Sequence, residues 1–159
     1  MLMREYQSSD LEKVMDIANA SWREIRKMSR AALGDRIADM LNPDGDDKSK
    51  GLQVKWQIDS KLYDIFVCEH DGEVVGFITY KIDGDFAEIC NNAAKPGTGL
   101  KGIGQTMYKF VLEKFRTAGV KVAKVTTGMD HAHEPARKAY ERAGFTKHLD
   151  STTYFMELD

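Results

Sequence analysis

The sequence predicts a mixed β-sheet with helices packed on it, an α/β fold of the α+β type. Three observations lead to this fold class. Apolar residues recur at helical spacing near the N-terminus, two β-rich runs flank a turn signal in the middle, and strand-like and helical segments alternate through the rest of the chain. A length of 159 residues, with 42% hydrophobic and 30% charged residues, suits one core, so we expect residues 1–159 to form a single domain.

Helices come first along the chain. Residues 8–10, "SSD", can cap a helix whose apolar side chains share one face, namely Leu11, Val14, Met15, Ile17, Ala18, Trp22 and Ile25. A second helix is predicted over 31–41, "AALGDRIADML", and it ends at a turn-rich acidic loop over 42–51. Residues 52–62, "LQVKWQIDSKL", alternate like a strand but have the length and flanks of a helix, and we favour the helix.

The middle of the chain predicts a β-hairpin. The runs 65–70, "IFVCEH", and 73–82, "EVVGFITYKI", flank an Asp-Gly pair, which is a strong signal for a hairpin turn. Residues 85–94, "DFAEICNNAA", predict a third strand that follows the hairpin directly.

The remaining elements alternate between helix and strand. Beyond a glycine-rich loop, a helix that ends at Gly119 has an apolar side made of Ile103, Met107, Phe110, Val111 and Phe115. Residues 120–128 predict a strand, and Pro135 lies in the first turn of a short helix that Gly144 ends. Residues 152–158, "TTYFMEL", predict a final strand.

Composition narrows the classes of partner. Lys and Arg total 23 against 25 Asp and Glu, and the formal net charge of −2 gives no footprint for nucleic acid or for an acidic membrane. We therefore expect a small-molecule partner. The first residues lack the apolar run of a signal peptide and no segment has membrane-spanning length, so we expect a cytoplasmic protein. Cys68 and Cys90 are isolated in strand-like stretches, which favours buried thiols over a catalytic cysteine.

A glycine-rich loop precedes the predicted helix at 103. Gly99, Gly102 and Gly104 let backbone amides approach a ligand, and the positive end of the helix dipole faces the same loop. Such a loop suits a phosphate or pyrophosphate, with Lys101 adding a positive charge, although three glycines can also serve only a tight turn. The spacing matches neither a P-loop nor a GxGxxG dinucleotide motif. His131 and His133 have no third ligand at a diagnostic spacing, so we expect no metal.

Two segments in this order resemble the signature of the GNAT family of acyl-CoA-dependent N-acyltransferases. Residues 88–104, "EICNNAAKPGTGLKGIG", are similar to the strand and pyrophosphate loop of that family. Residues 133–145, "HEPARKAYERAGF", are similar to its later helix, with Ala136, Tyr140, Gly144 and Phe145 in register. Three positions depart from the pattern: Gly99 replaces an Arg or Gln, Leu100 replaces a frequent glycine, and His133 replaces an asparagine.

The resemblance implies a fold and a cofactor. The fold would be acyl-CoA N-acyltransferase-like, with a mostly antiparallel central sheet of about six to seven strands and helices on both faces. Acetyl-CoA would lie in a gap where the strand at 85–94 and the strand at 120–127 splay apart, its pantetheine arm pairing with backbone at Asn92 and Ala94. The implied cofactor-binding residues are Asn92, Ala93, Ala94, Gly99, Leu100, Lys101, Gly102, Ile103, Gly104, His133 and Tyr140.

The resemblance also implies a reaction, which is direct transfer of an acetyl group to a primary amine of a small molecule, peptide or protein through a tetrahedral intermediate. An N–H near Asn92 or Ala93 would face the thioester oxygen. Tyr140 is the candidate acid, because a phenol with a pKa of about 10 can protonate a thiolate with a pKa of about 8.5. Glu88 is the candidate base, acting through water. A homodimer is a family-level expectation.

Alternatives stay open at each of these points. Periodicity alone favours a core position for Tyr140 and a solvated sheet face for Glu88. The chain could be a non-catalytic acyl-CoA-binding module of the same fold, or a nucleotide-binding domain, which would leave the register around Tyr140 unexplained. The acidic residues Asp44, Asp46 and Asp47 could attract a cationic amine or form only a solvated turn.

Overall fold

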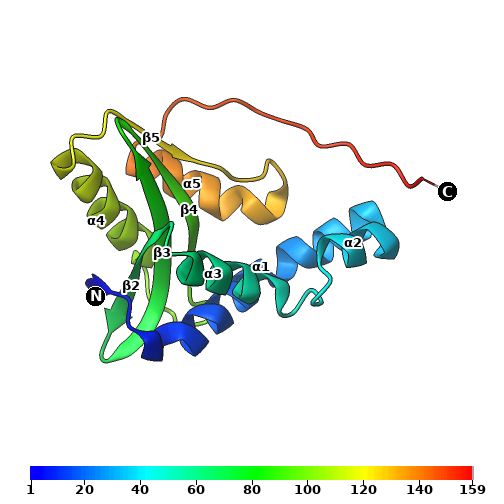
Figure 1. The fold of residues 1–159 in the computed structure, drawn as a ribbon, viewed down its shortest axis with the longest axis horizontal. Helices are drawn as coiled ribbons and strands as arrows, with labels where there is room; N and C mark the ends of the chain where they lie inside the picture. Colours follow the sequence, from blue (N-terminus) through cyan, green and yellow to red (C-terminus); the bar gives the residue numbers. More distant parts are fainter. Residues whose placement is uncertain (159) are drawn as a thin grey trace.

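The computed structural model describes residues 1–158, which form one sheet with helices on both of its faces (Figure 1). In chain order the elements are β1 (Leu2–Glu5), η1 (Ser8–Asp10), α1 (Leu11–Leu33), α2 (Asp35–Leu41), α3 (Ser49–Ser60), β2 (Asp64–His70), β3 (Glu73–Asp83), β4 (Phe86–Ala94), α4 (Ile103–Thr117), β5 (Val122–Val125), η2 (His131–His133) and α5 (Glu134–Ala143). None of the helices within residues 1–158 is long and apolar enough to cross a membrane.

The sheet has five strands in the order β1-β2-β3-β4-β5. Each strand is antiparallel to the next except β4 and β5, which are parallel. This confirms the mixed, mostly antiparallel sheet, but the predicted count of six to seven strands is wrong over the described residues. The short strand β1 was not predicted, because its four residues carry too little pattern to be recognised.

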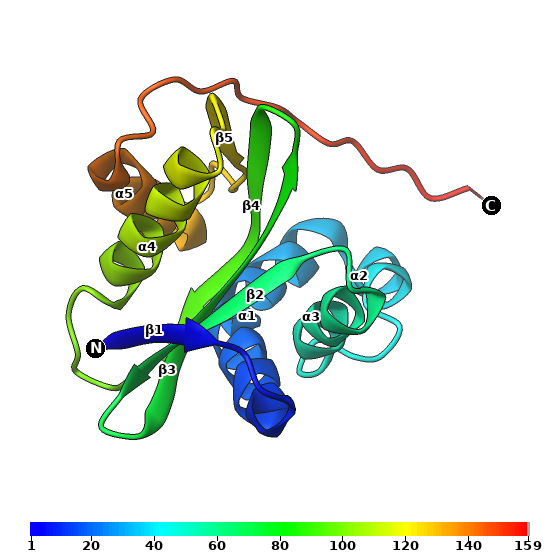
Figure 2. The ribbon, with the colours of Figure 1, turned by 60° about the vertical axis from the view of Figure 1, so that its left-hand side comes forward.

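The predicted strand over 152–158 is the clearest error. These residues have no strand assignment, and both ribbon views show the C-terminal segment extending away from the sheet (Figures 1 and 2). Tyr154 is 91% exposed and Met156 is 78% exposed, so the segment lacks the packing that stabilises a strand of high β-propensity. The homodimer expected by resemblance stays a prediction.

Helices cover both faces of the sheet (Figure 2), and a hydrophobic cluster lies between the helices and the sheet on each face. On one face, α4 and α5 pack through residues that include Ile103, Met107, Val111, Phe115 and Tyr140. On the other face, α1 and α3 pack through residues that include Val14, Ile17, Ala18 and Val54. Because both faces are covered, β3 is buried continuously from Val74 to Tyr80 and does not alternate.

The helical predictions are confirmed with shifted boundaries. The segment that fitted both strand and helix is the helix α3, which buries Val54 and leaves Trp56 59% exposed. α3 begins at Ser49, so the acidic loop is shorter than predicted. α1 continues to Leu33 and is ended by Gly34, whose φ of 82° lies in the left-handed region that favours glycine.

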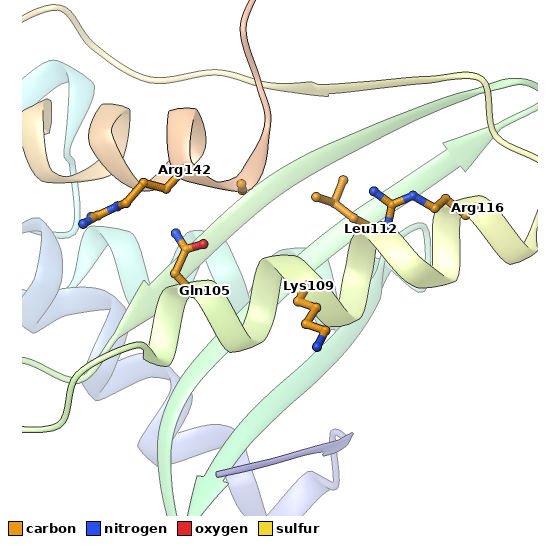
Figure 3. Close-up of a pocket in the computed structure, with 6 residues that line it drawn as sticks. Gln105, Lys109, Leu112, Arg116 and Arg142 are labelled. Carbon is orange, nitrogen blue, oxygen red and sulfur yellow. The ribbon is translucent and has the colours of Figure 1, made fainter.

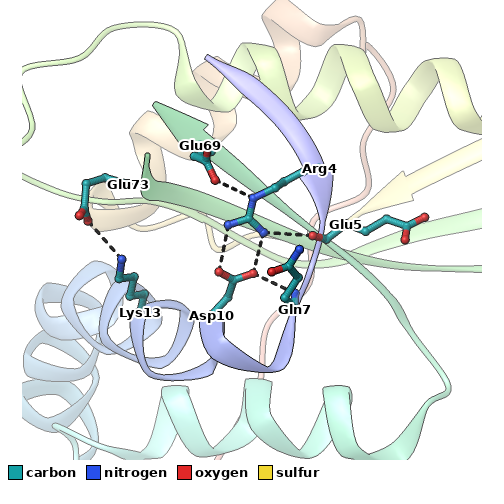
Figure 4. Close-up of polar contacts among 7 residues, drawn as sticks. All are labelled: Arg4, Glu5, Gln7, Asp10, Lys13, Glu69 and Glu73. Atoms are coloured by element: carbon teal, nitrogen blue, oxygen red, sulfur yellow. Dashed lines mark hydrogen bonds and ion pairs between the residues drawn. The ribbon is translucent and has the colours of Figure 1, made fainter. Parts of the chain in front are cut away.

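Arg4 of the edge strand β1 forms hydrogen bonds with η1 and with β2 (Figure 4). Its Nη1 and Nη2 donate to the two carboxylate oxygens of Asp10 at 2.7 and 3.0 Å, and its Nε donates to Glu69 Oε2 at 2.7 Å. Asp10 is only 5% exposed and also accepts a hydrogen bond of 2.9 Å from the N–H of Gln7. This network connects β1 to β2 and to the start of α1.

Asp10→Asn is expected to destabilise the fold in a pH-dependent way. The Arg4 guanidinium holds the pKa of Asp10 below its usual range, so its stabilisation is complete above the unfolded-state pKa of about 4 and is lost as pH falls through the lower folded-state pKa. We expect a loss of about 2 kcal/mol at pH 7 that shrinks below about pH 4. Urea unfolding across this range measures it, with exposed Asp16→Asn as control; a loss that is equal at every pH would contradict the ionic origin.

Candidate functional site

The parallel pair β4 and β5 separates halfway along β4. The two strands pair from Phe86 and Val122 to Ile89 and Val125, after which β4 continues to Ala94 and the other chain leaves the sheet toward η2. Within residues 1–158, this edge of β4 from position 90 to 94 therefore has no strand partner. The resemblance to the GNAT family predicts that these two strands splay apart at this place.

A β-bulge lies at the start of this unpaired edge. On β3, Tyr80 is opposite Ile89 and Ile78 is opposite Asn92, so Cys90 and Asn91 both face Thr79. The N–H of Asn91 donates to Thr79 Oγ1 at 2.9 Å. Asn91 Nδ2 and Thr79 Oγ1 both donate to Gln57 Oε1 of α3, at 2.7 and 3.0 Å. These buried contacts hold the bulge against α3.

The unpaired edge of β4 offers backbone N–H groups. The N–H of Lys95 donates to Val75 O at 2.8 Å and the N–H of Asn91 donates to Thr79, so both point toward β3. Because these groups alternate along a strand, the N–H groups of Asn92 and Ala94 point to the opposite, open edge. The carbonyl of Ala94 on that edge accepts a hydrogen bond of 3.1 Å from Ser21 Oγ of α1.

Tyr140 reaches the same edge from α5. Tyr108 of α4 donates its hydroxyl to Asn92 Oδ1 at 2.7 Å, and Asn92 Nδ2 donates to the Tyr140 hydroxyl oxygen at 3.2 Å. The two tyrosine rings are tilted, with centroids 5.3 Å apart. Burial raises the pKa of Tyr140 above its ordinary value, although Asn92 and Tyr108 oppose this shift, so the phenol is protonated at neutral pH.

This chain of hydrogen bonds runs in one direction, from Tyr108 through Asn92 to Tyr140. Tyr140 accepts from Asn92, which leaves its own proton available for another acceptor. The sequence prediction included the backbone of Asn92 but missed its side chain, and it missed Tyr108 altogether. Tyr108 is buried beside the apolar stripe of α4, where a polar role has no sequence signal.

The glycine loop ends at the N-terminus of α4. Gly97, Gly99 and Gly102 have φ values of 76°, 70° and 83°, so the turn itself requires glycines there. No side chain caps α4 and no acidic residue lies in its first turn. The helix therefore presents uncapped N–H groups and the positive end of its dipole, with the exposed ammonium of Lys101 nearby in the loop.

His133 is held by a neighbouring carboxylate. Its Nδ1 lies 2.6 Å from Asp130 Oδ2, and its backbone N–H donates to Asp130 Oδ1 at 3.1 Å. Arg137 of α5 donates to the carbonyls of Gly128 and Asp130 at 2.6 and 2.7 Å, which fixes this segment to α5. Within residues 1–158, no group of three or more His, Cys, Asp and Glu side chains could hold a metal ion.

Glu88 does not face Tyr140. Its neighbours Ala87 and Ile89 pack in the layer that contains Tyr140, so by strand alternation Glu88 projects from the other face of β4. Its carboxylate lies 3.0 Å from Lys124 Nζ and 3.3 Å from Lys81 Nζ, and these two ammonium groups lower its pKa. The role of Glu88 as a base stays a prediction.

The acidic loop residues are not all available to a ligand. Asp46 Oδ2 accepts from Arg30 Nε at 2.7 Å, and the same guanidinium pairs with Asp35 at 3.0 Å and Asp39 at 2.8 Å. Asp44 and Asp47 are exposed. The prediction that this cluster attracts a cationic amine is therefore weakened at Asp46, whose charge Arg30 already neutralises.

Two shallow pockets lie away from the tyrosines. One lies between α4 and α5 and is lined by Gln105, Lys109, Leu112, Arg116, Arg142 and Ala143 (Figure 3). Gln105 Nε2 donates to Ala139 O at 2.9 Å and joins the two helices there. The other pocket lies between α1 and the start of β3 and is lined by residues that include Lys13, Glu73 and Lys95. Neither pocket was predicted from the sequence.

Comparisons with known proteins identify the class that this fold and site define. The model of the acetyltransferase (GNAT) family matches residues 12–145. The chain therefore belongs to the GNAT family of acetyltransferases and is an acyltransferase enzyme. This confirms the resemblance seen in the two sequence segments. No curated protein matches the sequence.

Solved structures share the fold at low sequence identity. The PaiA N-acetyltransferase from Thermoplasma acidophilum, in complex with coenzyme A, is 22% identical with a TM-score of 0.66, covering 91% of this chain and 89% of that one. A GNAT family acetyltransferase from Brucella melitensis, in complex with acetyl-CoA, is 18% identical with a TM-score of 0.64, covering 92% and 82%. A mutant of the BH1408 protein from Bacillus halodurans is 11% identical with a TM-score of 0.73, covering 99% and 100%.

Proposed function

We propose that this enzyme transfers an acetyl group from acetyl-CoA directly to a primary amine of a small molecule, peptide or protein. The observation that carries the proposal is the unpaired edge of β4, which has Tyr140 beside it and is joined by the glycine loop to the uncapped N-terminus of α4. Membership of the acetyltransferase family supports it. The coenzyme A and acetyl-CoA bound to two structures of the same fold also support it.

The residues of this chain fit coenzyme A. The N–H groups of Asn92 and Ala94 would pair with the pantetheine arm as an added strand would, and the loop from Gly99 to Gly104 would hold the pyrophosphate through backbone amides. Lys101 would add charge, and His133 stands where the family pattern has its asparagine. The bound cofactor supplies an acetyl group activated as a thioester.

Tyr140 and Asn92 have distinct proposed roles. The N–H of Asn92 points to the open edge, whereas alternation turns the N–H of Ala93 toward β3, so Asn92 is the better candidate to face the thioester oxygen. The Asn92 side chain donates to the Tyr140 hydroxyl oxygen, so the proton of that hydroxyl points away from Asn92. Tyr140 is then the acid that protonates the leaving thiolate.

Amine-dependent release of the coenzyme A thiol tests this proposal. Acetyl-CoA is mixed with the enzyme and a panel of primary amines that carry positive, negative or no additional charge, and free thiol is followed over time. Thiol release that requires both enzyme and amine, with the acetylated amine seen by mass spectrometry, is the expected result. Tight acetyl-CoA binding with no release for any acceptor in the panel would contradict the proposal and favour the non-catalytic acyl-CoA-binding module.

Glu88→Gln is expected to lower kcat/KM for the amine by less than about 3-fold. A carboxylate that Lys81 and Lys124 hold ionised is a weak base, so we expect the proton of the amine to leave to solvent. The measurement is the pH profile of kcat/KM for both forms of the enzyme. A loss of about 10²-fold together with a changed acidic limb of that profile would instead establish Glu88 as the base.

A further inference from the structure

Two cationic side chains, Lys50 of α3 and Arg26 of α1, lie near each other, and neither forms an ion pair with a carboxylate in residues 1–158. Lys50 is only 7% exposed, and its Nζ donates to Gln53 Oε1 at 2.8 Å and lies 4.1 Å from the centroid of the Trp22 ring. Burial and, to a smaller extent, the nearby charge of Arg26 together lower the pKa of Lys50 to about 8. Among the described residues, Arg26 Nε is buried and has no hydrogen-bond partner.

The carboxylate of Asp46 forms no hydrogen bond with either cation. Asp46 interacts electrostatically with Arg26, but its Oδ2 accepts from Arg30 and its other oxygen is buried without a hydrogen bond. Arg30 also pairs with Asp35 and Asp39, so these carboxylates pair with Arg30 and with neither Arg26 nor Lys50. Arg26 Nε is therefore left without a hydrogen bond and Lys50 without a carboxylate partner, and a negatively charged ligand group that reached both would be stabilised there.

Both cations lie on helices that also contact the unpaired part of β4. Figure 2 shows α1 and α3 on the same face of the sheet, and the two helices contact each other. Gln57 of α3 contacts the bulge residue Asn91, and Lys50 lies two turns earlier on the same buried face, which is about 10 Å along the helix. On α1, Ser21 contacts Ala94, and Arg26 lies just over one turn further on.

We propose that Arg26 and Lys50 bind the carboxylate of the acceptor while its amine reaches the unpaired edge of β4. This inference rests on the proposed function and adds a substrate class to it, namely linear aminocarboxylates in which several bonds separate the two groups. Arg26 would contribute its unpartnered Nε–H and Lys50 its ammonium, and the Trp22 ring would cover the apolar chain of the acceptor. In the sequence alone, the acidic residues of the loop at 42–51 instead suggest a preference for cationic acceptors.

The test compares three acceptors of equal chain length. Initial rates of thiol release at saturating acetyl-CoA give kcat/KM for ε-aminocaproate, hexylamine and hexamethylenediamine, which end in a carboxylate, a methyl group and a second amine. We expect ε-aminocaproate to be preferred over both other acceptors by at least about 10-fold, the range of one hydrogen-bonded charge. Equal or better use of hexylamine or the diamine would overturn the proposal and leave the acetyl transfer itself standing.

Matched variants identify the residues. Arg26→Gln and Lys50→Met are expected to raise KM for ε-aminocaproate about 10-fold with little change for hexylamine, whereas Arg26→Lys and Lys50→Arg should keep most of the preference. Arg23→Gln and Lys48→Met remove exposed charges from the same helix and the adjacent loop and should change neither acceptor. Thermal melting checks that each variant folds. An equal loss for every acceptor would show a structural role and overturn the assignment.

A binding measurement separates this inference from the proposed function. Hexanoate, which has no amine, is titrated into the enzyme in the presence of coenzyme A, and binding is followed by calorimetry in the wild type and in Lys50→Met. Hexanoate binding that the substitution abolishes supports the carboxylate subsite even if no acceptor is acetylated. If hexanoate does not bind and ε-aminocaproate is not preferred, water fills this region and the proposal is wrong.

Discussion

Tyr140→Phe is expected to lower kcat by about 10²- to 10³-fold while the Kd for acetyl-CoA changes by less than about 3-fold. The substitution removes the hydroxyl that Asn92 orients and leaves the ring packed against Tyr108 and Phe145. A group that acts only when the thiolate leaves contributes to the chemical step and not to binding of the cofactor. Steady-state kinetics and calorimetry on the same preparation give both numbers.

Tyr108→Phe is the matched control for this prediction. It removes a buried hydroxyl one hydrogen bond further from the proposed reaction centre and leaves Tyr140 in place. We expect a smaller decrease in kcat, of roughly 3- to 10-fold, because Asn92 loses a donor and Tyr140 loses a hydroxyl that acts on its pKa, whereas the phenol of Tyr140 itself stays in place. The role of Tyr140 as the acid is contradicted if Tyr140→Phe keeps full turnover, or if both variants lose the same activity in proportion to lost stability.

Gly102→Asp is expected to weaken acetyl-CoA binding by roughly 30- to 150-fold, or about 2–3 kcal/mol. Gly102 has a φ of 83° at the N-cap of α4, and no atom beyond its chain neighbours lies within 4 Å of the position of an added Cβ. A carboxylate there would stand at the uncapped helix N-terminus that we propose for the pyrophosphate. It would both repel the phosphates and compete for the same N–H groups.

Gly102→Asn separates charge from shape at this position. Asparagine has nearly the same size as aspartate and tolerates the left-handed region similarly. We expect Gly102→Asn to bind acetyl-CoA within about 5-fold of the wild type, since it adds no charge. Equal affinities of the Asn and Asp variants in isothermal titration would show that the loop does not hold the pyrophosphate.

Local signals were sufficient for much of the fold. The Asp-Gly pair at 71 and 72 turns the hairpin with both residues at positive φ, and Gly144 ends α5 at a φ of 105°. The strand at 86–94, the loop after it and the helix from Ile103 follow from patterns that need no distant partner. A functional role for Tyr140 could be predicted only from the alignment of residues 133–145 with the family motif, because helical periodicity predicts only a core residue there. The structure places its hydroxyl beside Asn92.

The features that sequence reasoning missed depend on contacts between distant residues. β1 is held by Arg4, which reaches Asp10 and Glu69 and so joins residues 65 positions apart in the chain. The segment at 152–158 has the composition of a strand, but a strand also needs a partner edge, and composition cannot supply one. Arg26 and Lys50 look like ordinary surface residues in the sequence, and only the packing of α1 against α3 buries Lys50 and brings it near Arg26.

Calorimetric titration with acetyl-CoA tests the central claim most directly, with coenzyme A, ATP and NAD as controls. The claim is that the unpaired edge of β4 and the N-terminus of α4 together bind the cofactor. The account predicts micromolar binding of acetyl-CoA, about −8 kcal/mol, comparable binding of coenzyme A, and at least about 100-fold weaker binding of ATP and NAD, which lack the pantetheine arm. No binding of either coenzyme A species, or equal binding of ATP, would contradict it.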